Sequence, residues 1–500
     1  MATQGRTAQG TWRQWAPLVA AMAVGFALRT YHIGVPLVDT SDWRQTDTAA
    51  VAYFYTHLGI RLLHPQLWHD GPGPDYTQLE LQLTPALTAL AAHLVGWHTW
   101  LLHLVPDMLF TLSTIPLWAL VRRHLGPGPA AWTALIYALL PVGIFFGRAF
   151  QPEPMMLLTG LAGLWAVDRW ALAHTPGRFA VACALLCVAV LAKLPNLMLL
   201  PGAAALAYQD VLWRWRTMLS RRWLAATFPL LAAPVAAGAG YTLLQRQLAA
   251  HGTHYVDFIV TSLGQSYIAG HRRLSVFILR DVLALAITPT GLLLLLFGCA
   301  LLAIRHPGRV RWFWVWGVAI GLYGVVVLRA IRFQYYLMPV LPWLAIPMGV
   351  ALDALTGILP LQLPRPLRAA PAIAAVLLTV ATLSGGLYGI RGYWPPAWSI
   401  YRLGHALNRT LPAHTTVILS GTYNPTLLFY ARRHGYRVNP LTPALLRADI
   451  AGGARYLVDQ GGVGACLTRY LQTHMAERYI RGTPVFTLPA KPPRIPSGCA

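Results

Sequence analysis

Apolar stretches of about 20 residues recur along roughly the first 390 positions of this 500-residue chain. Each stretch is long enough to cross a hydrocarbon core of about 30 Å. Hydrophobic residues make up 56% of the chain and charged residues only 11%, which is not the composition of a soluble globular protein. The sequence therefore predicts an α-helical polytopic membrane protein with about eleven transmembrane helices.

The apolar segment 82–96 decides the topology. It is only about 15 residues long, so it is either a short span or an interfacial or re-entrant helix. If it does not cross, the arginine-bearing loops all fall on one side, which the positive-inside rule assigns to the cytoplasm. This arrangement predicts a cytoplasmic N-terminus and an extracytoplasmic C-terminus. The predicted spans are then roughly 15–34, 100–121, 129–147, 154–173, 179–192, 195–209, 223–245, 278–304, 312–329, 333–355 and 369–390.

The chain is strongly basic, with a formal net charge of +23. Most arginines lie in short loops between spans, where they orient the protein, so nucleic acid is not a predicted partner. Phosphate groups of membrane lipids or of a substrate are the expected anions. Lysine occurs only at Lys193 and Lys491, which makes a lysine inside an apolar run conspicuous.

The last hundred residues differ in character from the rest. Short apolar runs such as TTVILSGTYN alternate with helix-like pieces, which is typical of a small α/β domain. We therefore divide the chain into a transmembrane domain, 1–390, and a C-terminal domain, 391–500, with 35–99 as the first outer loop. Cys466 and Cys499 could form a disulfide if the C-terminal domain is extracytoplasmic.

Six of the sixteen acidic residues lie between Asp39 and Glu80, directly after the first predicted span. Carboxylates are costly near a bilayer, so this cluster predicts a reaction site at the membrane surface. In SDWRQTDT, Asp42 or Asp47, beside Arg44, is suited to act as a general base on a hydroxyl or amine. The alternative is a solvated loop in which Asp47 or Thr48 caps the start of a helix, where an acidic residue interacts favourably with the helix dipole.

Three further features are predicted to lie on the same outer face. Glu153 stands between two prolines, as either a second functional carboxylate or a charge at a helix N-terminus. Lys193 interrupts an apolar run, so it either snorkels to the interface or binds a phosphate. Arg272 and Arg332 are candidates for the same anion, and contact with lipid headgroups is the alternative for Arg272.

Histidines crowd the acidic loop and raise the question of a metal. His57, His64 and His69 could bind a divalent ion together with Glu80, but their spacing matches no tight ligand pattern. Ordinary polar contacts are the alternative. A divalent ion at Glu80 is thus an open prediction, and no other cofactor is predicted.

Five segments occur in an order that resembles the GT-C superfamily of membrane glycosyltransferases. They are WRQTDTAAVA, LELQLTPALTALAAHLVG, GRAFQPEPMML, AKLPN and RFQYYLMPVLPWLA. The sequence is most similar to bacterial members of the dolichyl-phosphate-mannose–protein mannosyltransferase and aminoarabinose transferase family, over roughly residues 15–350. The resemblance implies a GT-C fold, a polyprenyl-phosphate-linked sugar donor, and an acceptor that is a glycan, a lipid or a protein.

The resemblance also implies roles for single residues. It implies a catalytic aspartate in the first outer loop, with Asp47 as first choice and Asp42 as second, and Glu153 as the acidic residue of the second outer loop. It places Glu80 near a position where some relatives bind a divalent ion. The residues implied in substrate binding are Arg44, Glu80, Lys193, Arg272, Arg332, Tyr335 and Tyr336. The remaining aspartates, Asp39, Asp70 and Asp75, are expected to be solvated loop residues.

The function implied is inverting transfer of a sugar from a polyprenyl-phosphate carrier at the outer face of a bacterial inner membrane. The leaving group is already an anionic phosphate, so it needs cations rather than a proton donor. A secondary transporter or lipid flippase is the alternative, because charges near a membrane also line permeation paths. A non-catalytic assembly factor with the same fold is a third possibility.

Overall fold

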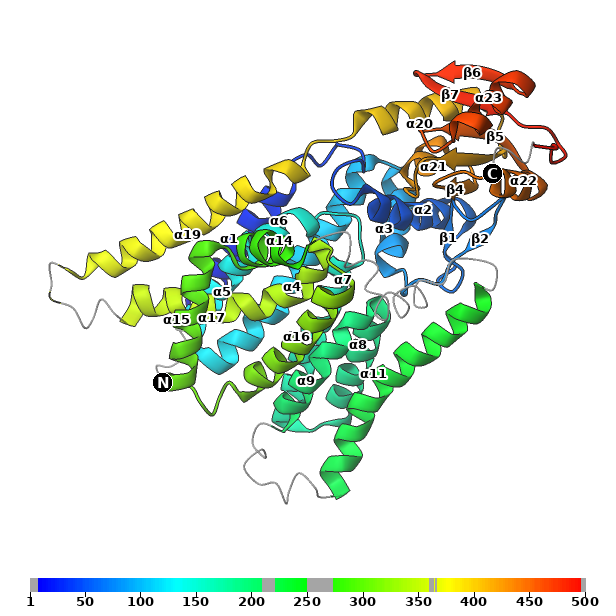
Figure 1. Ribbon diagram of the computed structural model, residues 1–500. Helices are drawn as coiled ribbons and strands as arrows, with labels where there is room; N and C mark the ends of the chain where they lie inside the picture. Colours follow the sequence, from blue (N-terminus) through cyan, green and yellow to red (C-terminus); the bar gives the residue numbers. More distant parts are fainter. Residues whose placement is uncertain (1–7, 209–220, 250–272, 359–363, 365–366, 496–500) are drawn as a thin grey trace. The chain divides into compact units, whose positions relative to one another are not determined.

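Helices make up most of the chain, which confirms the predicted fold class in its main feature (Figure 1). The computed structural model describes residues 8–208, 221–249, 273–358, 364 and 367–495, so the predicted site residue Arg272 lies outside it. The chain divides into two units, named here the helical unit and the mixed unit. The helical unit comprises Met1–Ile33, Leu102–Thr242 and Val256–Tyr393; the mixed unit comprises Gly34–Leu101, Leu243–Tyr255 and Trp394–Ala500.

Proline opens several helices of the helical unit. Pro127 begins α5 and Pro176 begins α8, where a missing N–H costs little because first-turn N–H groups have no partner within the helix. Within this unit α7 packs on α8, and α17 packs on both α5 and α15. The helices are α1 (Ala8–Arg29), α4 (Thr99–Leu125), α5 (Pro127–Leu139), α6 (Pro141–Phe146), α7 (Glu153–Ala173), α8 (Pro176–Ala192), η1 (Leu194–Met198), α9 (Leu199–Ala207), α11 (Arg221–Leu248), α14 (Leu274–Val276), η2 (Phe277–Ile287), α15 (Pro289–Arg305), α16 (Arg311–Ala330), η3 (Gln334–Val340), α17 (Leu341–Asp353), η4 (Ala354–Ile358), α19 (Ala369–Ile390) and η6 (Arg391–Tyr393).

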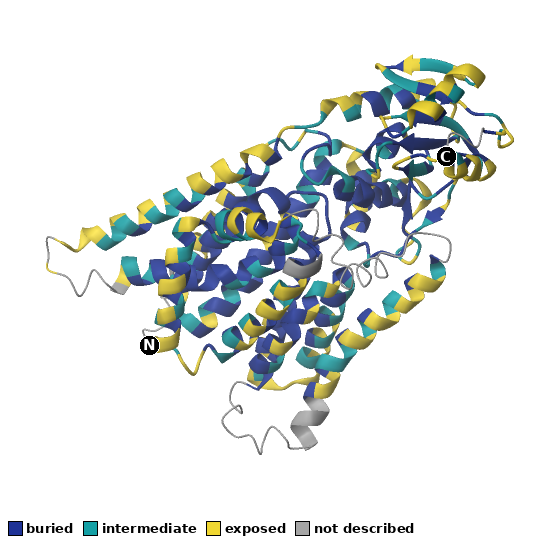
Figure 2. Cartoon of the chain, in the orientation of Figure 1, coloured by how far each residue is buried: buried dark blue, intermediate teal, exposed yellow. Residues whose placement is uncertain are grey.

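Some of these helices keep apolar side chains exposed. Figure 2 shows exposed turns along α19, where Val376, Leu377 and Val380 are each more than half exposed. Apolar faces of this length are suited to contact lipid. Among the described residues four helices are long and apolar enough to cross a membrane, or five if one bent pair counts as a span. The membrane-protein character is confirmed, whereas the number eleven stays a prediction.

The predicted span 278–304 is not one straight helix. It consists of η2, which ends at Ile287, and α15, which begins at Pro289, and the two are bent by 70°. Pro289 has no N–H to continue a helix, and Thr288 accepts a hydrogen bond from the Gly291 N–H (3.0 Å) to cap the new one. A break at a proline is therefore the physical reason for the bend.

A five-stranded sheet lies in the mixed unit, with the strand order β4-β3-β5-β7-β6. The fully buried strand β3 pairs in parallel with β4 and β5, while β7 and β6 extend the sheet in antiparallel fashion. This confirms the predicted sheet near the C-terminus. The elements are α20 (Trp398–Thr410), β3 (Thr416–Ser420), α21 (Thr426–Ala431), β4 (Gly435–Val438), α22 (Pro443–Ala451), β5 (Ala454–Asp459), α23 (Ala465–His474), β6 (Ala476–Ile480) and β7 (Thr483–Thr487).

The first predicted outer loop also belongs to the mixed unit and lies along the edge of this sheet. Its elements are α2 (Asp42–Leu58), β1 (Gln66–Leu67), β2 (Asp75–Tyr76) and α3 (Leu83–Val95). The Gly435 N–H of β4 donates to the Trp68 carbonyl (3.0 Å), and the Asp70 N–H donates to the Gly435 carbonyl (3.0 Å). Only glycine fits at 435, because a Cβ there would lie 2.1 Å from the Val417 carbonyl oxygen.

One hydrophobic core joins the first loop to the C-terminal residues. Phe54 of α2 belongs to the same buried cluster as Val417 of β3 and Leu428 of α21. The observed grouping therefore differs from the predicted boundary at 390/391, since residues 34–101 pack with residues 394–500. Burial of shared apolar surface is the cause of this grouping.

Candidate active site

Helix α2 begins at Asp42, so the prediction that a helix starts at Asp47 was wrong. Ser41, with φ 64°, makes the turn that precedes the helix, and a carboxylate in the first turn suits the helix dipole. Asp42 is half-buried, and the Asn424 Nδ2 lies 3.1 and 3.0 Å from its two carboxylate oxygens. Burial raises the pKa of Asp42, although the hydrogen bond from Asn424 opposes the rise.

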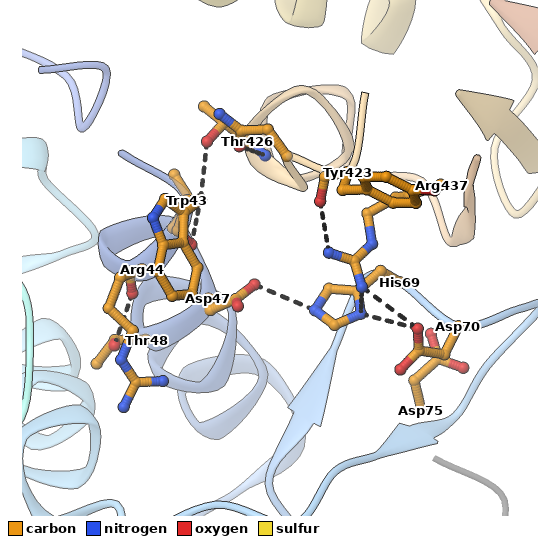
Figure 3. A network of polar contacts seen from close by, with 12 residues as sticks. Trp43, Arg44, Asp47, Thr48, His69, Asp70, Asp75, Tyr423, Thr426 and Arg437 are labelled. Carbon is orange, nitrogen blue, oxygen red and sulfur yellow. Dashed lines mark hydrogen bonds and ion pairs between the residues drawn. The ribbon is translucent and has the colours of Figure 1, made fainter. Parts of the chain in front are cut away.

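Asp47 lies inside the second turn of α2 and is buried, with 2% of its surface exposed. Its Oδ1 is 3.2 Å from the Nε2 of His69, and the Nδ1 of His69 is 3.1 Å from Asp70 (Figure 3). Arg437 of β4 donates to the Tyr423 carbonyl (2.7 Å) and contacts His69 (2.9 Å) and Asp70 (3.4 Å). Asp47 is thus the buried end of a chain of polar contacts.

His69 is fully buried between two carboxylates. Burial lowers its pKa, but the charge of Asp47 and the hydrogen bonds that His69 donates to Asp47 and Asp70 outweigh burial and the charge of Arg437, so the pKa is raised above 6.5. A protonated imidazole can place an N–H group toward each carboxylate, Nε2 toward Asp47 and Nδ1 toward Asp70, while the positive charge of Arg437 opposes protonation.

Because the pKa of His69 is raised in the folded protein, we expect the free energy of unfolding to depend on pH. The stabilisation is fully present below the ordinary value of 6.5 and is lost as the pH rises through the higher folded-state value. We expect the melting temperature of the full chain in detergent to fall over this range. His69→Gln should remove that pH dependence, and a variant that keeps the wild-type slope would contradict the assignment.

Glu80 pairs with Arg44 and does not begin a helix, since α3 starts only at Leu83. Its carboxylate therefore already has a cation partner. In the part of the chain that the structure describes, no group of three or more His, Cys, Asp or Glu side chains could hold a metal ion. A divalent ion at Glu80 therefore stays a prediction. His57, a predicted ligand, instead contacts the Tyr53 carbonyl (2.8 Å).

The expectation that Asp39 and Asp75 are solvated was wrong. They are 5% and 7% exposed. Gln45 donates to Asp39 (2.6 Å), and the His434 Nδ1 lies 2.9 Å from Asp75. Burial raises the pKa of Asp75, and His434 opposes the rise. These residues are buried because the C-terminal residues cover the loop, which the loop sequence alone does not reveal.

In the helical unit, Glu153 is the first residue of α7 and forms an ion pair with Lys193. Glu153 is 1% exposed, so the pair is buried. Lys193 follows directly after α8 as its C-cap, and its Nζ lies 5.6 Å from the ring centroid of Tyr335 and 5.3 Å from that of Tyr336. The ammonium group therefore faces a carboxylate and two aromatic rings, and both kinds of partner stabilise a cation.

Glu153, Lys193, Tyr335 and Tyr336 are named here the lysine cluster of the helical unit. Arg332 lies between α16 and η3 and is half-buried, while the Tyr323 hydroxyl donates to the Tyr336 carbonyl (2.9 Å). Gln151 was not predicted. It is fully buried, and neither amide atom has a hydrogen-bond partner among the described residues. A buried amide of this kind is costly unless a ligand or water satisfies it.

The candidate-site residues that sequence reasoning missed come from the C-terminal segment. Asn424, His434 and Arg437 contact first-loop aspartates more than 350 positions earlier in the chain. The usable signal was that Asn424 follows the carboxyl end of a buried strand in TTVILSGTYN, where parallel sheets carry ligand-binding residues. Sequence spacing alone gives no pairing over that distance.

Comparisons with known proteins agree with this fold. Residues 82–238 match the family model for dolichyl-phosphate-mannose-protein mannosyltransferase. No curated protein matches the chain. The structure is similar to ArnT from Cupriavidus metallidurans bound to undecaprenyl phosphate, with a TM-score of 0.62, 15% identity, and coverage of 96% of this chain and 100% of that one.

Two other solved structures share the architecture. The oligosaccharyltransferase of Archaeoglobus fulgidus in the apo form has a TM-score of 0.58, 13% identity, and coverage of 91% of this chain and 70% of that one. Arabinofuranosyltransferase AftD from Mycobacteria has a TM-score of 0.53, 15% identity, and coverage of 96% and 40%. Another structure of the archaeal enzyme is a complex with Zn and sulfate.

These likenesses confirm the resemblance predicted from the sequence. The chain shares its fold with these membrane glycosyltransferases, and residues 82–238 match the family model for dolichyl-phosphate-mannose-protein mannosyltransferase. At 13–15% identity the solved structures establish the fold alone.

Proposed function

We propose that this chain is an inverting glycosyltransferase that moves a sugar from a polyprenyl-phosphate carrier to an acceptor hydroxyl or amine. The family match and the fold support the reaction class. The observation that carries the proposal is Asp42, a half-buried carboxylate with both oxygens oriented, at the start of the first-loop helix. No cation contacts Asp42 among the described residues, so its oxygens can accept a proton.

In the proposed reaction Asp42 takes the proton from the acceptor as the acceptor oxygen or nitrogen attacks the anomeric carbon. The bond between that carbon and the phosphate oxygen breaks, its electrons go to the phosphate, and the configuration inverts. Burial suits Asp42 to this task, because a raised pKa brings a carboxylate closer to the working pH of a base. The leaving polyprenyl phosphate carries negative charge and needs no proton donor.

We assign a different role to Asp47, the first choice from the sequence. Its burial and its contact with His69 make it a group that holds α2 in place rather than one that meets an acceptor. Asp42 takes over the role of base because it starts the helix and is the more accessible of the two. Arg44, held by Glu80, stays a proposed substrate-binding residue next to it.

The lysine cluster of the helical unit is the proposed phosphate ligand. Lys193 is a cation beside Tyr335 and Tyr336, and Glu153 fixes the direction of its ammonium group. Arg332 is proposed as a second cation for the same anion. ArnT is a structural neighbour that binds undecaprenyl phosphate, which supports a donor of this chemical class. No step of the proposal passes through a metal ion.

We further propose that the C-terminal segment lies outside the cytoplasm, in a bacterial inner membrane protein with a cytoplasmic N-terminus. Cys466 is disulfide-bonded, which fits an oxidising compartment, while Cys499, its expected partner, lies outside the described residues. The sugar and the acceptor are left open by this proposal.

The test uses the full chain, purified and reconstituted in liposomes, with a panel of radiolabelled undecaprenyl-phosphate sugars and a membrane extract as the source of acceptors. We expect label from one donor to move to an acceptor, with release of unlabelled undecaprenyl phosphate. A transporter or flippase would instead move the intact lipid between leaflets. Translocation without transfer for every donor would overturn the proposal in favour of that alternative.

A further inference from the structure

Asn424 connects the sheet of the mixed unit to the proposed base. It lies in the loop between β3 and α21, and its Nδ2 is 3.1 and 3.0 Å from the two carboxylate oxygens of Asp42. A carboxylate only accepts hydrogen bonds, so an amide in this place must present its NH₂ group. Contact with both oxygens fixes the rotation of the carboxylate as well as its position.

The orientation of the Asn424 amide is determined by its own loop. Its Oδ1 accepts a hydrogen bond from the Thr426 N–H (3.0 Å), and its backbone N–H donates to the Thr422 hydroxyl (2.9 Å). With Oδ1 engaged in this local turn, only Nδ2 is left to point at α2. The hydrogen bonds within the loop thus fix the direction of the amide independently of its contact with Asp42.

A second contact holds the same loop against the same helix. The Thr426 side chain is fully buried, and its hydroxyl is 3.1 Å from the hydroxyl of Thr46, one turn beyond Asp42. Leu427, the next residue of α21, belongs to the buried cluster that also contains Val51 of α2. Polar and apolar contacts therefore fix the loop relative to the start of α2.

The groups around Asp42 make the hydrogen bond from Asn424 important for the pKa of Asp42. Tyr430 of α21 and Asp39 lie close enough to interact electrostatically in this part of the unit, and neither supplies a positive charge. Burial raises the pKa of Asp42, and the hydrogen bond from Asn424 is the largest influence that opposes it, ahead of the Trp43 N–H. Removal of the amide donor should therefore raise this pKa further.

We propose that Asn424 is a positioning residue for Asp42, through which the C-terminal segment sets the direction of the carboxylate that accepts the proton. The inference rests on the proposed function for its catalytic meaning. The contact itself is testable without any transfer reaction, because the sugar and the acceptor are not needed to measure the protonation of Asp42.

The experiment is carbodiimide modification of the purified full chain at a series of pH values. Carbodiimides react with protonated carboxyl groups, so the midpoint of modification reports the pKa. Trypsin releases residues 30–44, which contain both Asp39 and Asp42, and fragmentation in the mass spectrometer separates the two. Asp39 is an internal reference, because it accepts from Gln45 (2.6 Å) instead of Asn424.

Two substitutions separate the loop from the contact. Asn424→Ser keeps an oxygen that can accept from the Thr426 N–H, but its shorter side chain lacks the NH₂ group that reaches both oxygens of Asp42. Asn424→Asp keeps the same acceptor and replaces the donor by a like charge. Asn408→Ala is the matched control, because this asparagine accepts from Arg433 (3.0 Å) and does not contact Asp42.

We expect Asn424→Ser to raise the Asp42 midpoint by about one pH unit, which is a tenfold change in its protonation equilibrium. Asn424→Asp should raise it further, and Asn408→Ala should leave it unchanged. In the transfer assay the acid side of the pH profile should move by the same amount. An Asn424→Ser midpoint equal to wild type, even with a lower melting temperature, would overturn the proposal. A shifted midpoint in a protein whose Asp42→Asn variant still transfers sugar would instead refute only the role of Asp42 as base.

Discussion

We expect Asp42→Asn to lower the rate of sugar transfer by about 10²–10⁴-fold, the range that a general base contributes. The asparagine amide occupies nearly the same volume as the carboxylate but cannot take a proton from the acceptor. Because Asn424 already donates to this side chain, the new amide can present its oxygen to the same partner and α2 should remain folded. The measurement is the initial rate of label transfer in liposomes, together with the melting temperature.

A matched control for this variant is Asp449→Asn. Asp449 is also a buried aspartate of the mixed unit, and burial raises its pKa to about 6, but it lies on α22 and has no contact with α2 among the described residues. It should keep wild-type transfer. Asp47→Asn provides the second comparison: it removes the charge that faces His69, so we expect lower stability and a smaller loss of rate than for Asp42→Asn. If Asp47→Asn were the more damaging change for transfer at equal stability, the two aspartates would have to exchange roles.

Lys193→Met is expected to destabilise the helical unit by about 3–5 kcal/mol, because it leaves the buried Glu153 carboxylate without its cation. Methionine has a similar shape but no charge. The double variant Glu153→Gln with Lys193→Met removes both charges and should recover most of that loss. The quantity to measure is the free energy of unfolding in mixed detergent micelles.

Transfer separates the structural role of Lys193 from its proposed role at the phosphate. If Lys193 binds the donor phosphate, the double variant regains stability but not activity. Recovery of both would contradict the assignment. Lys491→Met is the control, since this exposed lysine is the only other one in the chain.

The sequence was sufficient to predict the fold class because lipid imposes a simple rule, that each span is a long apolar helix. It was less informative where prolines intervene, as at Pro289, because a kinked helix has the same hydropathy as a straight one. The concentration of carboxylates between Asp39 and Glu80 drew attention to the first outer loop from the sequence alone. Its internal order was not predicted, because Asp75, for example, is buried against His434, which lies hundreds of positions away.

The choice between Asp42 and Asp47 shows the same limit at the scale of one helix. Sequence patterns place a helix start only to within a few residues. Because the prediction relied on the apolar run AAVAYFY, the predicted start lies C-terminal to the observed start at Asp42. The partners of both aspartates come from the C-terminal segment. Long-range pairing of this kind depends on tertiary packing, for which local spacing carries no information.

The hydrogen bonds between Gly435 and the segment that contains Trp68 and Asp70 have a consequence for biosynthesis. An open sheet edge is a hazard, because it can recruit a strand from another molecule, and here the first loop covers the edge of β4. The loop is synthesised long before the strand it covers. The loop therefore cannot complete these hydrogen bonds until β4, which lies hundreds of positions later in the chain, has been synthesised.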